Sequence, residues 1–347
     1  MMKKLNRIIF IIILLIVVWI LMLKWSKFEN KNKDFKYAVI NSSQQSNGSI
    51  VAYDEDGKKV FKKAINFKGI DENGPSYVSG PQKYNNKYYI GAISSFKAQD
   101  KIIILDENLN VEAIPGHEYT NFALNNSYMY ITYTNVNEGT TLKQINLDTN
   151  EVEKETKISG IILPEIIFFE DEIILIGNIE SKTYENMKIV SLSPKDFKIN
   201  YEKVIENMKL PHGYEVLNNK VYFIPTIDNL DNDIKKLVVY DREKKELEEE
   251  DIPLNNIRFI KIINNRLYGI QSTIDNGEDS MFILDLKSKE YKIINLQHCV
   301  REVNFSENKI TMASNDHVYV YDINNLKLKK NFKYDDDDLM FGTLIVR

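Results

Sequence analysis

The sequence contains one cysteine, Cys299, among its 347 residues. A single thiol cannot form an intramolecular disulfide or a zinc–thiolate cluster, and it leaves no heme-attachment or paired-thiol motif. The chain also lacks a basic excess, because residues 37–347 carry 37 Lys and Arg against 48 Asp and Glu, within a formal net charge of −5. This balance argues against a basic nucleic-acid face. We therefore expect neither redox chemistry through protein sulfur nor a nucleic-acid partner.

Glycine motifs that bind phosphate or expose a nucleophile are also missing. The short stretches at Gly48 and Gly139 have no helix-forming segment behind them, so they are read as loops. The rest of the composition, 43% hydrophobic and 27% charged, is that of a folded protein. Disorder is excluded for most of the chain.

The amino-terminal segment contains an uninterrupted apolar run from Ile8 to Leu23. Lys3, Lys4 and Arg7 precede the run and Lys24 ends it. At about 1.5 Å per residue in a helix, sixteen residues span about 24 Å, somewhat less than the hydrocarbon core of about 30 Å. Flanking Lys and Arg side chains extend to the interface and offset the difference. Residues 1–23 are therefore predicted to form one transmembrane helix.

A cleaved signal peptide is the alternative interpretation of this segment. Residues 24–29, KWSKFE, offer no small-x-small cleavage site, and no cysteine is present for lipid attachment, so we favour an uncleaved signal anchor. The positive charges ahead of the run predict that the amino terminus lies inside and the acidic domain outside the cytoplasm. Residues 24–36 are polar and aperiodic, and we interpret them as a short tether.

The remainder, residues 37–347, is a repeat with two alternating landmarks. The first landmark is a two-residue segment between apolar stretches, either Asn-Asn or an acidic residue followed by Asp or Asn, which predicts a tight hairpin turn. It occurs at Asn85-Asn86, Asn125-Asn126, Glu170-Asp171, Asn218-Asn219, Asn264-Asn265 and Glu307-Asn308. Between them, β-rich stretches end in an aromatic residue or Leu followed by Asp, at Asp54, Asp106, Asp148, Asp241, Asp285 and Asp322, and Ser193 fills the same place in the fourth unit. Each unit is therefore predicted to have four strands.

Seven such units in 311 residues average about 44 residues each, which is typical of an all-β, seven-bladed β-propeller. Helical solenoids are excluded because the apolar residues alternate with period two, and an immunoglobulin tandem would repeat at about 100 residues. Six or eight blades stay open if the irregular fourth unit is misread. The first unit starts with its second strand at Tyr37, while the last carries a surplus strand, Leu339–Val346, which we expect to close the ring.

The strand-ending Tyr-Asp and Leu-Asp pairs, together with Gly116-His117, resemble the WD40-like and YVTN-like propeller superfamily over roughly residues 36–347. In WD40 repeats a glycine–histidine pair precedes the next blade. The resemblance is generic, since both tryptophans, Trp19 and Trp25, lie ahead of the repeats and the Trp-Asp dipeptide is absent. Tryptophan-docking motifs, sialidase Asp-boxes and kelch glycine pairs are absent too, so the resemblance implies a fold and no particular enzyme family.

Three of the four histidines enter innermost strands, and an acid follows each: His117, His212 and His298, with Glu118, Glu215 and Glu302. Converging at the central channel, they would supply metal ligands or an acid–base group. We favour a structural role instead, because WD40-type blades use a histidine here for internal hydrogen bonds. His317 is expected only to be exposed.

Acidic loops are the second candidate site. Asp228, Asp231 and Asp233 lie between the second and third strands of one blade, Asp275–Asp279 lie in the same place in the next blade, and Asp335–Asp338 precede the last strand. Clustered Asp and Asn suit calcium, but none of these loops has the spacing of a twelve-residue EF-hand loop. We interpret them as solvated loops, and we expect no metal or cofactor.

The function that we favour is a membrane-anchored, extracytoplasmic propeller that binds a protein or cell-envelope component through its loops. The alternative is a propeller hydrolase or lyase with a histidine or metal site at the central channel. A third class is a sensory or assembly component of a membrane complex. The sequence does not name the ligand.

Overall fold

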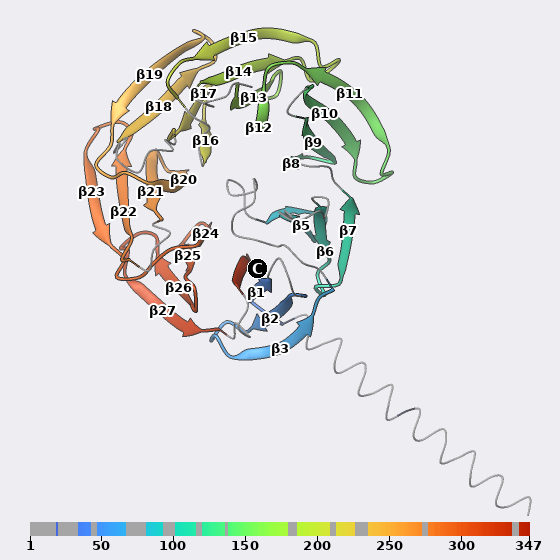
Figure 1. Cartoon of the computed structure of the whole chain (residues 1–347). Coiled ribbons are helices and arrows are strands. Elements are labelled where there is room, and N and C mark those ends of the chain that lie inside the picture. The colour runs from blue at the N-terminus through green and yellow to red at the C-terminus, as the bar shows by residue number, and fades with distance from the viewer. Residues whose placement is uncertain are drawn as a thin grey trace, which may run out of the picture.

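The computed structural model describes Trp19 and residues 34–42, 47–66, 81–92, 101–115, 120–135, 138–179, 186–208, 213–225, 235–272, 277–334 and 340–347. These residues form seven four-stranded antiparallel sheets, arranged around a common centre (Figure 1). The predicted all-β propeller with seven blades is confirmed, including the irregular fourth unit. Within the described residues no helix is long and apolar enough to cross a membrane. The predicted span lies outside them, apart from Trp19.

The strands of blades 1 to 3 are, from the innermost outwards, β28 (Met340–Val346), β1 (Tyr37–Ser42), β2 (Ser49–Tyr53) and β3 (Lys59–Ala64); β4 (Gln82–Tyr84), β5 (Lys87–Ala92), β6 (Lys101–Leu105) and β7 (Val111–Pro115); and β8 (Thr120–Asn125), β9 (Tyr128–Asn135), β10 (Gly139–Asn146) and β11 (Val152–Ile158). Blades 4 and 5 comprise β12 (Ile162–Phe168), β13 (Ile173–Asn178), β14 (Met187–Leu192) and β15 (Ile199–Ile205); and β16 (Tyr214–Leu217), β17 (Lys220–Phe223), β18 (Lys236–Asp241) and β19 (Glu246–Asp251). Blades 6 and 7 comprise β20 (Ile257–Ile263), β21 (Arg266–Gln271), β22 (Ser280–Asp285) and β23 (Tyr291–Asn295); and β24 (Glu302–Phe305), β25 (Lys309–Ala313), β26 (His317–Asp322) and β27 (Leu328–Lys333).

Blade 1 is built from both ends of the propeller sequence. The first described strand, β1, takes the second place in its sheet, as predicted, and β28 lies inside it. The two strands pair antiparallel, with Tyr37 opposite Val346 and Ala38 opposite Ile345. The carboxy-terminal strand thus occupies the place that the first unit leaves open.

The strand-ending Asp residues organise the turn between the third and fourth strands. In blade 1 the Oδ1 of Asp54 accepts the backbone N–H groups of Asp56 and Lys58 at 2.9 Å each. Asp106, Asp241, Asp285 and Asp322 each accept two backbone N–H groups in the same way. A short carboxylate in this position fixes the turn, because it satisfies N–H groups that have no strand partner.

Blade 3 departs from the pattern that the sequence indicated. There β10 ends at Asn146, and the Oδ1 of Asn146 accepts the N–H groups of Asp148 and Thr149 at 2.9 and 3.2 Å. Asp148, which we had assigned to the strand end, is instead a donor within the turn. An amide oxygen accepts the same bonds as a carboxylate, so the turn keeps its form with the acceptor two residues earlier.

The turns between the first and second strands are the predicted Asn-rich hairpins. Asn85 and Asn86 have φ of 45° and 60°, and Asn264 and Asn265 have φ of 52° and 59°. Two successive residues with positive φ form the turn whose twist matches an antiparallel pair, and Asn tolerates this conformation better than most residues.

Apolar side chains from the faces of adjacent sheets form the core at the blade boundaries. Among the described residues there are seven buried clusters, one at each boundary. At the boundary of blades 7 and 1, Phe332 of β27 packs on Tyr37 and Tyr53 with ring centroids 5.3 and 5.2 Å away. Gly57 lies against this ring with φ of 76°, where a Cβ atom would come within 2.5 Å of it.

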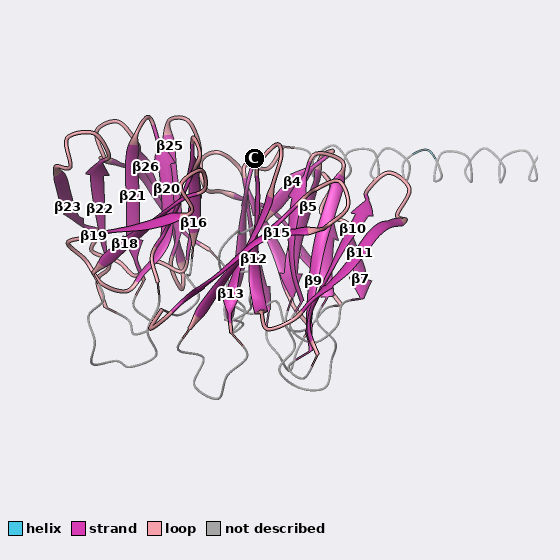
Figure 2. Ribbon diagram, turned by 90° about the horizontal axis from the view of Figure 1, so that it is seen from above, coloured by secondary structure: helices cyan, strands magenta, loops and turns pink. Residues whose placement is uncertain are grey.

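The strands run between two ends of the disc (Figure 2). We call the end with the turns inside each blade, between strands one and two and between strands three and four, the turn face. The opposite end carries the connections between strands two and three and those between blades, and we call it the loop face. Tyr37 pairs with Tyr53, which immediately precedes the Asp54 turn, so the propeller begins at the turn face.

Candidate functional site

His298 is the one predicted channel histidine among the described residues. It lies between β23 and β24, in the connection that enters blade 7, and the residue is only 8% exposed. Its Nδ1 is 2.8 Å from the carbonyl oxygen of Cys299 and its Nε2 is 2.9 Å from the hydroxyl of Tyr321. The ring also stacks on Tyr319, with centroids 3.7 Å apart. Both ring nitrogens are therefore engaged inside the protein.

These contacts define the protonation of the ring. A carbonyl oxygen only accepts hydrogen bonds, so Nδ1 carries the hydrogen and Nε2 accepts the O–H of Tyr321. Burial lowers the pKa of His298, even though its bond to the Cys299 carbonyl acts in the opposite direction. A neutral imidazole with a hydrogen bond at each ring nitrogen agrees with the structural role that we favoured, and it leaves no lone pair for a metal.

Asp279 supports the connection that carries His298. Its backbone N–H donates to the carbonyl of His298 at 3.1 Å, and its carbonyl accepts the N–H of Leu296 at 2.9 Å. Its carboxylate accepts the N–H of Val300 at 2.7 Å. We expected this acidic stretch to be solvated, and Glu278 is exposed, but Asp279 is fully buried. Asp279 therefore connects the segment before β22 to the segment between β23 and β24, and the composition of the acidic stretch alone does not reveal this role.

The other predicted site residues are distributed as follows. His317 begins β26, with its Nδ1 2.9 Å from Asp316 and 30% of its side chain exposed. The remaining candidates lie outside the described residues, namely His117, His212, Glu118, Asp228, Asp231, Asp233, Asp275 and Asp335–Asp338. Within the part of the chain that the structure describes, no group of three or more His, Cys, Asp or Glu residues is placed to hold a metal ion.

Glu215 and Glu302, two of the acids that follow the histidines, bridge neighbouring blades. Glu215 of β16 accepts the Nζ of Lys261 at 2.8 Å and the N–H of Ile262 at 3.4 Å, both from β20 of the next blade. Glu302 of β24 accepts the N–H of Leu344 in β28 at 2.8 Å. Each carboxyl group therefore joins one innermost strand to the next.

The same type of contact occurs at innermost strands that we had not singled out. Gln82 of β4 forms a paired bond to β8, donating to the carbonyl of Phe122 at 3.2 Å and accepting the N–H of Leu124 at 2.7 Å. Asn121 of β8 donates to the carbonyl of Pro164 in β12 at 3.1 Å. We call these residues the inner clasps: Gln82, Asn121, Glu215 and Glu302. Their signal in the sequence is a polar residue three to five positions ahead of each Asn- or acid-containing hairpin.

Burial alters the acidity of the innermost carboxyl groups. It raises the pKa of Glu302 to about 8, against the opposing effect of hydrogen bonds from Thr343 and Leu344. It also raises the pKa of Glu165 in β12 to about 8, although Asn121 donates to that carboxyl group. The pKa of Glu215 is raised too, because desolvation outweighs Lys261. Since Glu302 and Glu165 are protonated at neutral pH, they act as hydrogen-bonding groups rather than as charges.

A pocket of about 220 Å³ opens on the turn face between blades 4 and 5. Arg242 lies in it, with Nη1 and Nη2 at 2.7 and 3.2 Å from the two carboxylate oxygens of Asp171. The guanidinium also lies 4.5 Å from the ring centre of Phe169, and Nη1 is 3.3 Å from Glu172. Arg242 of blade 5 thus pairs with two acids of blade 4 across the blade boundary, and with Glu243 the lining of the pocket keeps an excess of negative charge.

No protein-family model and no curated protein matches the sequence. Among solved structures, apo AztD from Citrobacter koseri is similar with a TM-score of 0.54 at 8% identity, over 89% of this chain and 97% of that one. The AfRom2 CNH domain is similar with a TM-score of 0.50 at 11% identity, over 74% and 84%. Kuenenia stuttgartiensis hydrazine synthase has a TM-score of 0.48 at 15% identity over 62% of this chain, which spans 65%, less than two thirds, of that protein. Together with the seven four-stranded sheets formed by the described residues, the first two similarities identify the chain as a seven-bladed β-propeller.

Proposed function

We propose that the chain is a membrane-anchored, extracytoplasmic binding module whose loop face recognises a protein or a cell-envelope component. The pairing of β28 with β1 and the core between blades 7 and 1 support a ring closed by the carboxy-terminal strand. A disc of this kind is a rigid support, and its connections vary without disturbing the sheets. Binding through such connections needs no catalytic group.

The observation that carries this proposal is the engagement of those candidate catalytic residues that the structure describes. His298 has both ring nitrogens bonded inside the protein, and Glu215 and Glu302 bond to the strands of adjacent blades. A general base or metal ligand needs a lone pair directed at the substrate or ion. These groups direct theirs at the protein, so a binding role agrees with the geometry better than hydrolysis or elimination.

The place where the propeller begins supports an orientation for the module. The tether, residues 24–36, spans at most about 45 Å when fully extended. It joins the propeller at the turn face, next to Tyr37 and the Asp54 turn. A short tether from this end keeps blade 1 close to the membrane, and the loop face, at the opposite end of the disc from the tether, is then accessible to a partner.

Site-specific photocrosslinking in intact cells tests the binding face. A photoreactive residue replaces Glu278, which is exposed on the loop face of blade 6, and in a matched control it replaces Lys287, which is exposed on the turn face of the same blade. We expect a discrete crosslinked partner from position 278 and none from position 287, with the adduct identified by mass spectrometry. Equal adducts from both positions, or from position 287 alone, would overturn the assignment of the loop face.

Protease added to intact cells tests the location. The propeller should be degraded while a cytoplasmic control protein survives, and the full chain should remain with the membrane fraction. Release of a mature form that starts near residue 25 would contradict the anchor. Survival of the propeller under the same conditions would place it inside the cell.

A further inference from the structure

The outermost strands differ sharply in charge. The strands β27 and β3, on adjacent blades 7 and 1, together contain six lysines and no acidic residue: Lys59, Lys62, Lys63, Lys329, Lys330 and Lys333. The outermost strand of blade 5, β19, has the sequence ELEEED, with five acidic residues and no basic one. The outermost strands of the other blades carry a net charge between −1 and +1. We call the six lysines the basic rim.

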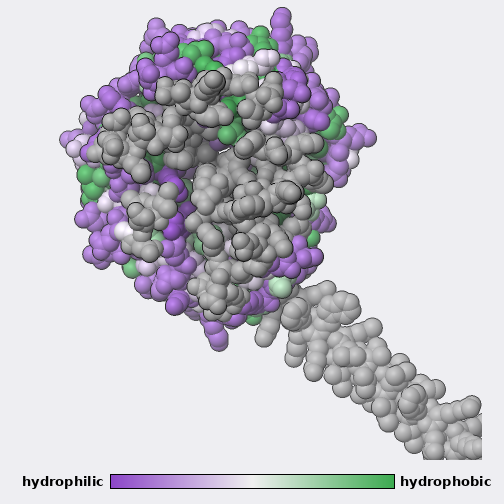
Figure 3. All heavy atoms as spheres, viewed as in Figure 1, coloured by the Kyte–Doolittle hydropathy of each residue, from purple (hydrophilic) through white to green (hydrophobic). Residues whose placement is uncertain are grey.

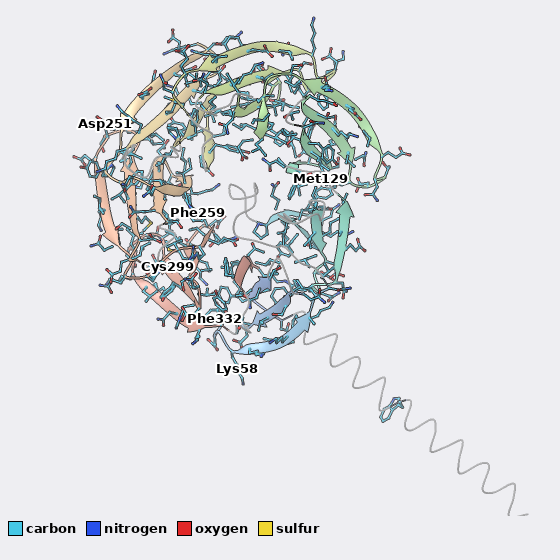
Figure 4. The ribbon with its side chains drawn as sticks, in the orientation of Figure 1. Lys58, Met129, Asp251, Phe259, Cys299 and Phe332 are labelled. Atoms are coloured by element: carbon cyan, nitrogen blue, oxygen red, sulfur yellow. The ribbon has the colours of Figure 1, made fainter. Side chains whose placement is uncertain are left out.

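The two strands of the basic rim form one continuous surface. Lys330 donates to the carbonyl oxygen of Glu55 and lies 3.5 Å from Asp56, both in blade 1. Phe332 packs on Tyr37 and Tyr53 across the same boundary. In Figures 1 and 4, β27 and β3 follow one another along the circumference, with Phe332 at their junction and Asp251 of β19 further around the ring.

The members of the basic rim divide into two groups by their surroundings. Lys63 donates to Asn110 at 2.9 Å and Lys330 to Glu55, so these two half-buried lysines hold adjacent blades together. The other four, at positions 59, 62, 329 and 333, are exposed, and the circumference of the disc is mostly hydrophilic in Figure 3. Lys329 has an ion pair with Asp322 at 3.3 Å and is still 53% exposed. Four ammonium groups on one edge form a surface complementary to a layer of anions.

We propose that the basic rim binds the anionic phospholipid headgroups of the membrane that holds the apolar segment Ile8–Leu23. This inference rests on the proposed anchor. The propeller begins in blade 1, so the tether brings the edge formed by blades 7 and 1 within about 45 Å of the bilayer and gives it a high effective concentration there. A distant polyanion has no such advantage. The disc leans on this edge, the acidic β19 stays away from the headgroups, and the loop face remains accessible.

Lysine footprinting of the full chain tests the contact directly. The chain is reconstituted into vesicles of phosphatidylcholine alone or of phosphatidylcholine with phosphatidylglycerol, and a membrane-impermeant acylating reagent is added. Because each lysine near an anionic surface contributes appreciably to binding, we expect acylation of Lys62, Lys329 and Lys333 to slow by about fivefold with phosphatidylglycerol and to recover at high salt. The exposed Lys195, Lys198 and Lys244 of blades 4 and 5 serve as internal controls and should not change.

The outcomes separate the basic rim from the anchor. Flotation of the same vesicles reports whether the chain is inserted. A chain that floats but shows equal acylation with and without phosphatidylglycerol overturns the rim contact and leaves the anchor intact. A chain that fails to float overturns both. A soluble polyanion can also be added to the chain in vesicles of phosphatidylcholine alone. If it protects the rim lysines from acylation as strongly as phosphatidylglycerol does, the rim is assigned to a polyanion instead.

A variant gives a second measurement that does not depend on the labelling chemistry. The triple substitution Lys62→Gln, Lys329→Gln and Lys333→Gln is compared with Lys195→Gln, Lys198→Gln and Lys244→Gln, which remove the same charge elsewhere. We expect only the rim variant to lose the phosphatidylglycerol-dependent approach of a lipid-headgroup fluorophore to the propeller. Circular dichroism of both variants confirms that the sheets persist. An unchanged response in the folded rim variant would overturn the proposal.

Discussion

The innermost and outermost strands of the propeller hold neighbouring blades together by different means. On the inside, the inner clasps are buried or half-buried polar groups that bond to the backbone of the next blade, as Glu302 and Gln82 do. On the outside, long side chains reach the turn of the next blade across the surface, as Lys63 does to Asn110 and Lys203 to the carbonyl of Lys245. The four-stranded repeat is the same on both sides, but the inner contacts are less exposed to solvent than the outer ones.

That difference determines what each contact is worth. A buried donor or acceptor that loses its partner costs about 1–3 kcal/mol, because no water replaces the bond. An exposed ion pair contributes about 0–1 kcal/mol, because water and salt compete with it. The inner contacts therefore set the stability of the ring, and the outer charges are free to serve recognition. The acidic β19 and the basic rim show how far the outer strands differ without altering the sheets.

Removal of residues 339–347 should have the largest effect. The deletion removes β28, so β1 loses its inner neighbour and Glu302 loses the N–H of Leu344. The inner edge of β1 is then unpaired, and we expect loss of cooperative unfolding together with aggregation. Circular dichroism and light scattering measure both. A synthetic peptide of residues 339–347 added in trans should restore part of the transition, and a truncated chain with unchanged melting would contradict a ring closed by β28.

Substitution of Glu302 should be next in size. Glu302→Ala leaves the N–H of Leu344 without its partner and opens a small void, so we expect a loss of about 3 kcal/mol in the free energy of unfolding. Glu302→Gln keeps an acceptor of the same shape and should cost less than about 1 kcal/mol near pH 5. Urea titration measures both. A loss as large for Gln as for Ala would show that the carboxyl proton, rather than the acceptor oxygen, holds β28.

The pH dependence of these proteins sharpens the test. Burial raises the pKa of Glu302 in the folded state to about 8, above its ordinary value, so the folded chain binds a proton that the unfolded chain releases. The stabilising contribution is therefore complete below the ordinary pKa of glutamate and is lost as the pH rises towards 8. Glu302→Gln removes this component, so the variant should gain stability relative to the wild type between pH 5 and 8. Glu165 adds a similar component that both proteins retain.

Substitution of His298 should have a smaller effect on stability, and the contribution of His298 should be lost towards low pH rather than towards high pH. His298→Ala removes the hydrogen bonds to the Cys299 carbonyl and the Tyr321 hydroxyl, which keeps only a 3.5 Å contact with the Leu296 carbonyl, and we expect a loss of about 2 kcal/mol in the free energy of unfolding with no change in metal content. Because burial lowers the pKa of His298, its contribution is present above about pH 6.5 and is lost as the pH falls. Stoichiometric metal in the wild type that disappears with His298→Ala, without a comparable fall in melting temperature, would contradict the structural role.

The sequence predicted those features of the fold that depend on local backbone chemistry. Asn pairs marked the hairpins because they tolerate positive φ, and Asp54 and its equivalents marked turns because their carboxylates bond within four residues. The sequence also showed that the first unit has one strand too few and the last unit one strand too many. The assignment of Asp148 was wrong because the acceptor, Asn146, lies two residues earlier, and sequence spacing does not distinguish an amide oxygen from a carboxylate.

The candidate site was less accessible to sequence reasoning, because its contacts join residues far apart in the chain. Gln82 bonds to Leu124, and Glu215 bonds to Lys261 in the next blade. A polar residue within an alternating strand looks the same whether it faces water or a neighbouring blade, so its partner is known only from the structure. The structural role favoured for His298 stays a prediction, and the hydrogen-bond partner that supports it, Tyr321, lies 23 residues further along the chain in β26.

The smallest expected effect is at the outer contact of blades 5 and 6. The Nζ of Lys289, in the turn between β22 and β23, pairs with Glu250 of β19, and the two side chains are 51% and 28% exposed. A double-mutant cycle with Lys289→Ala and Glu250→Ala should give a coupling of about 0.5 kcal/mol that falls further in high salt, since solvent screens an exposed pair. Urea unfolding of the four proteins measures the coupling. A value above about 2 kcal/mol that persists in salt would give an outer contact the strength of an inner clasp, and the proposed division between a stabilising inside and a variable outside would no longer hold.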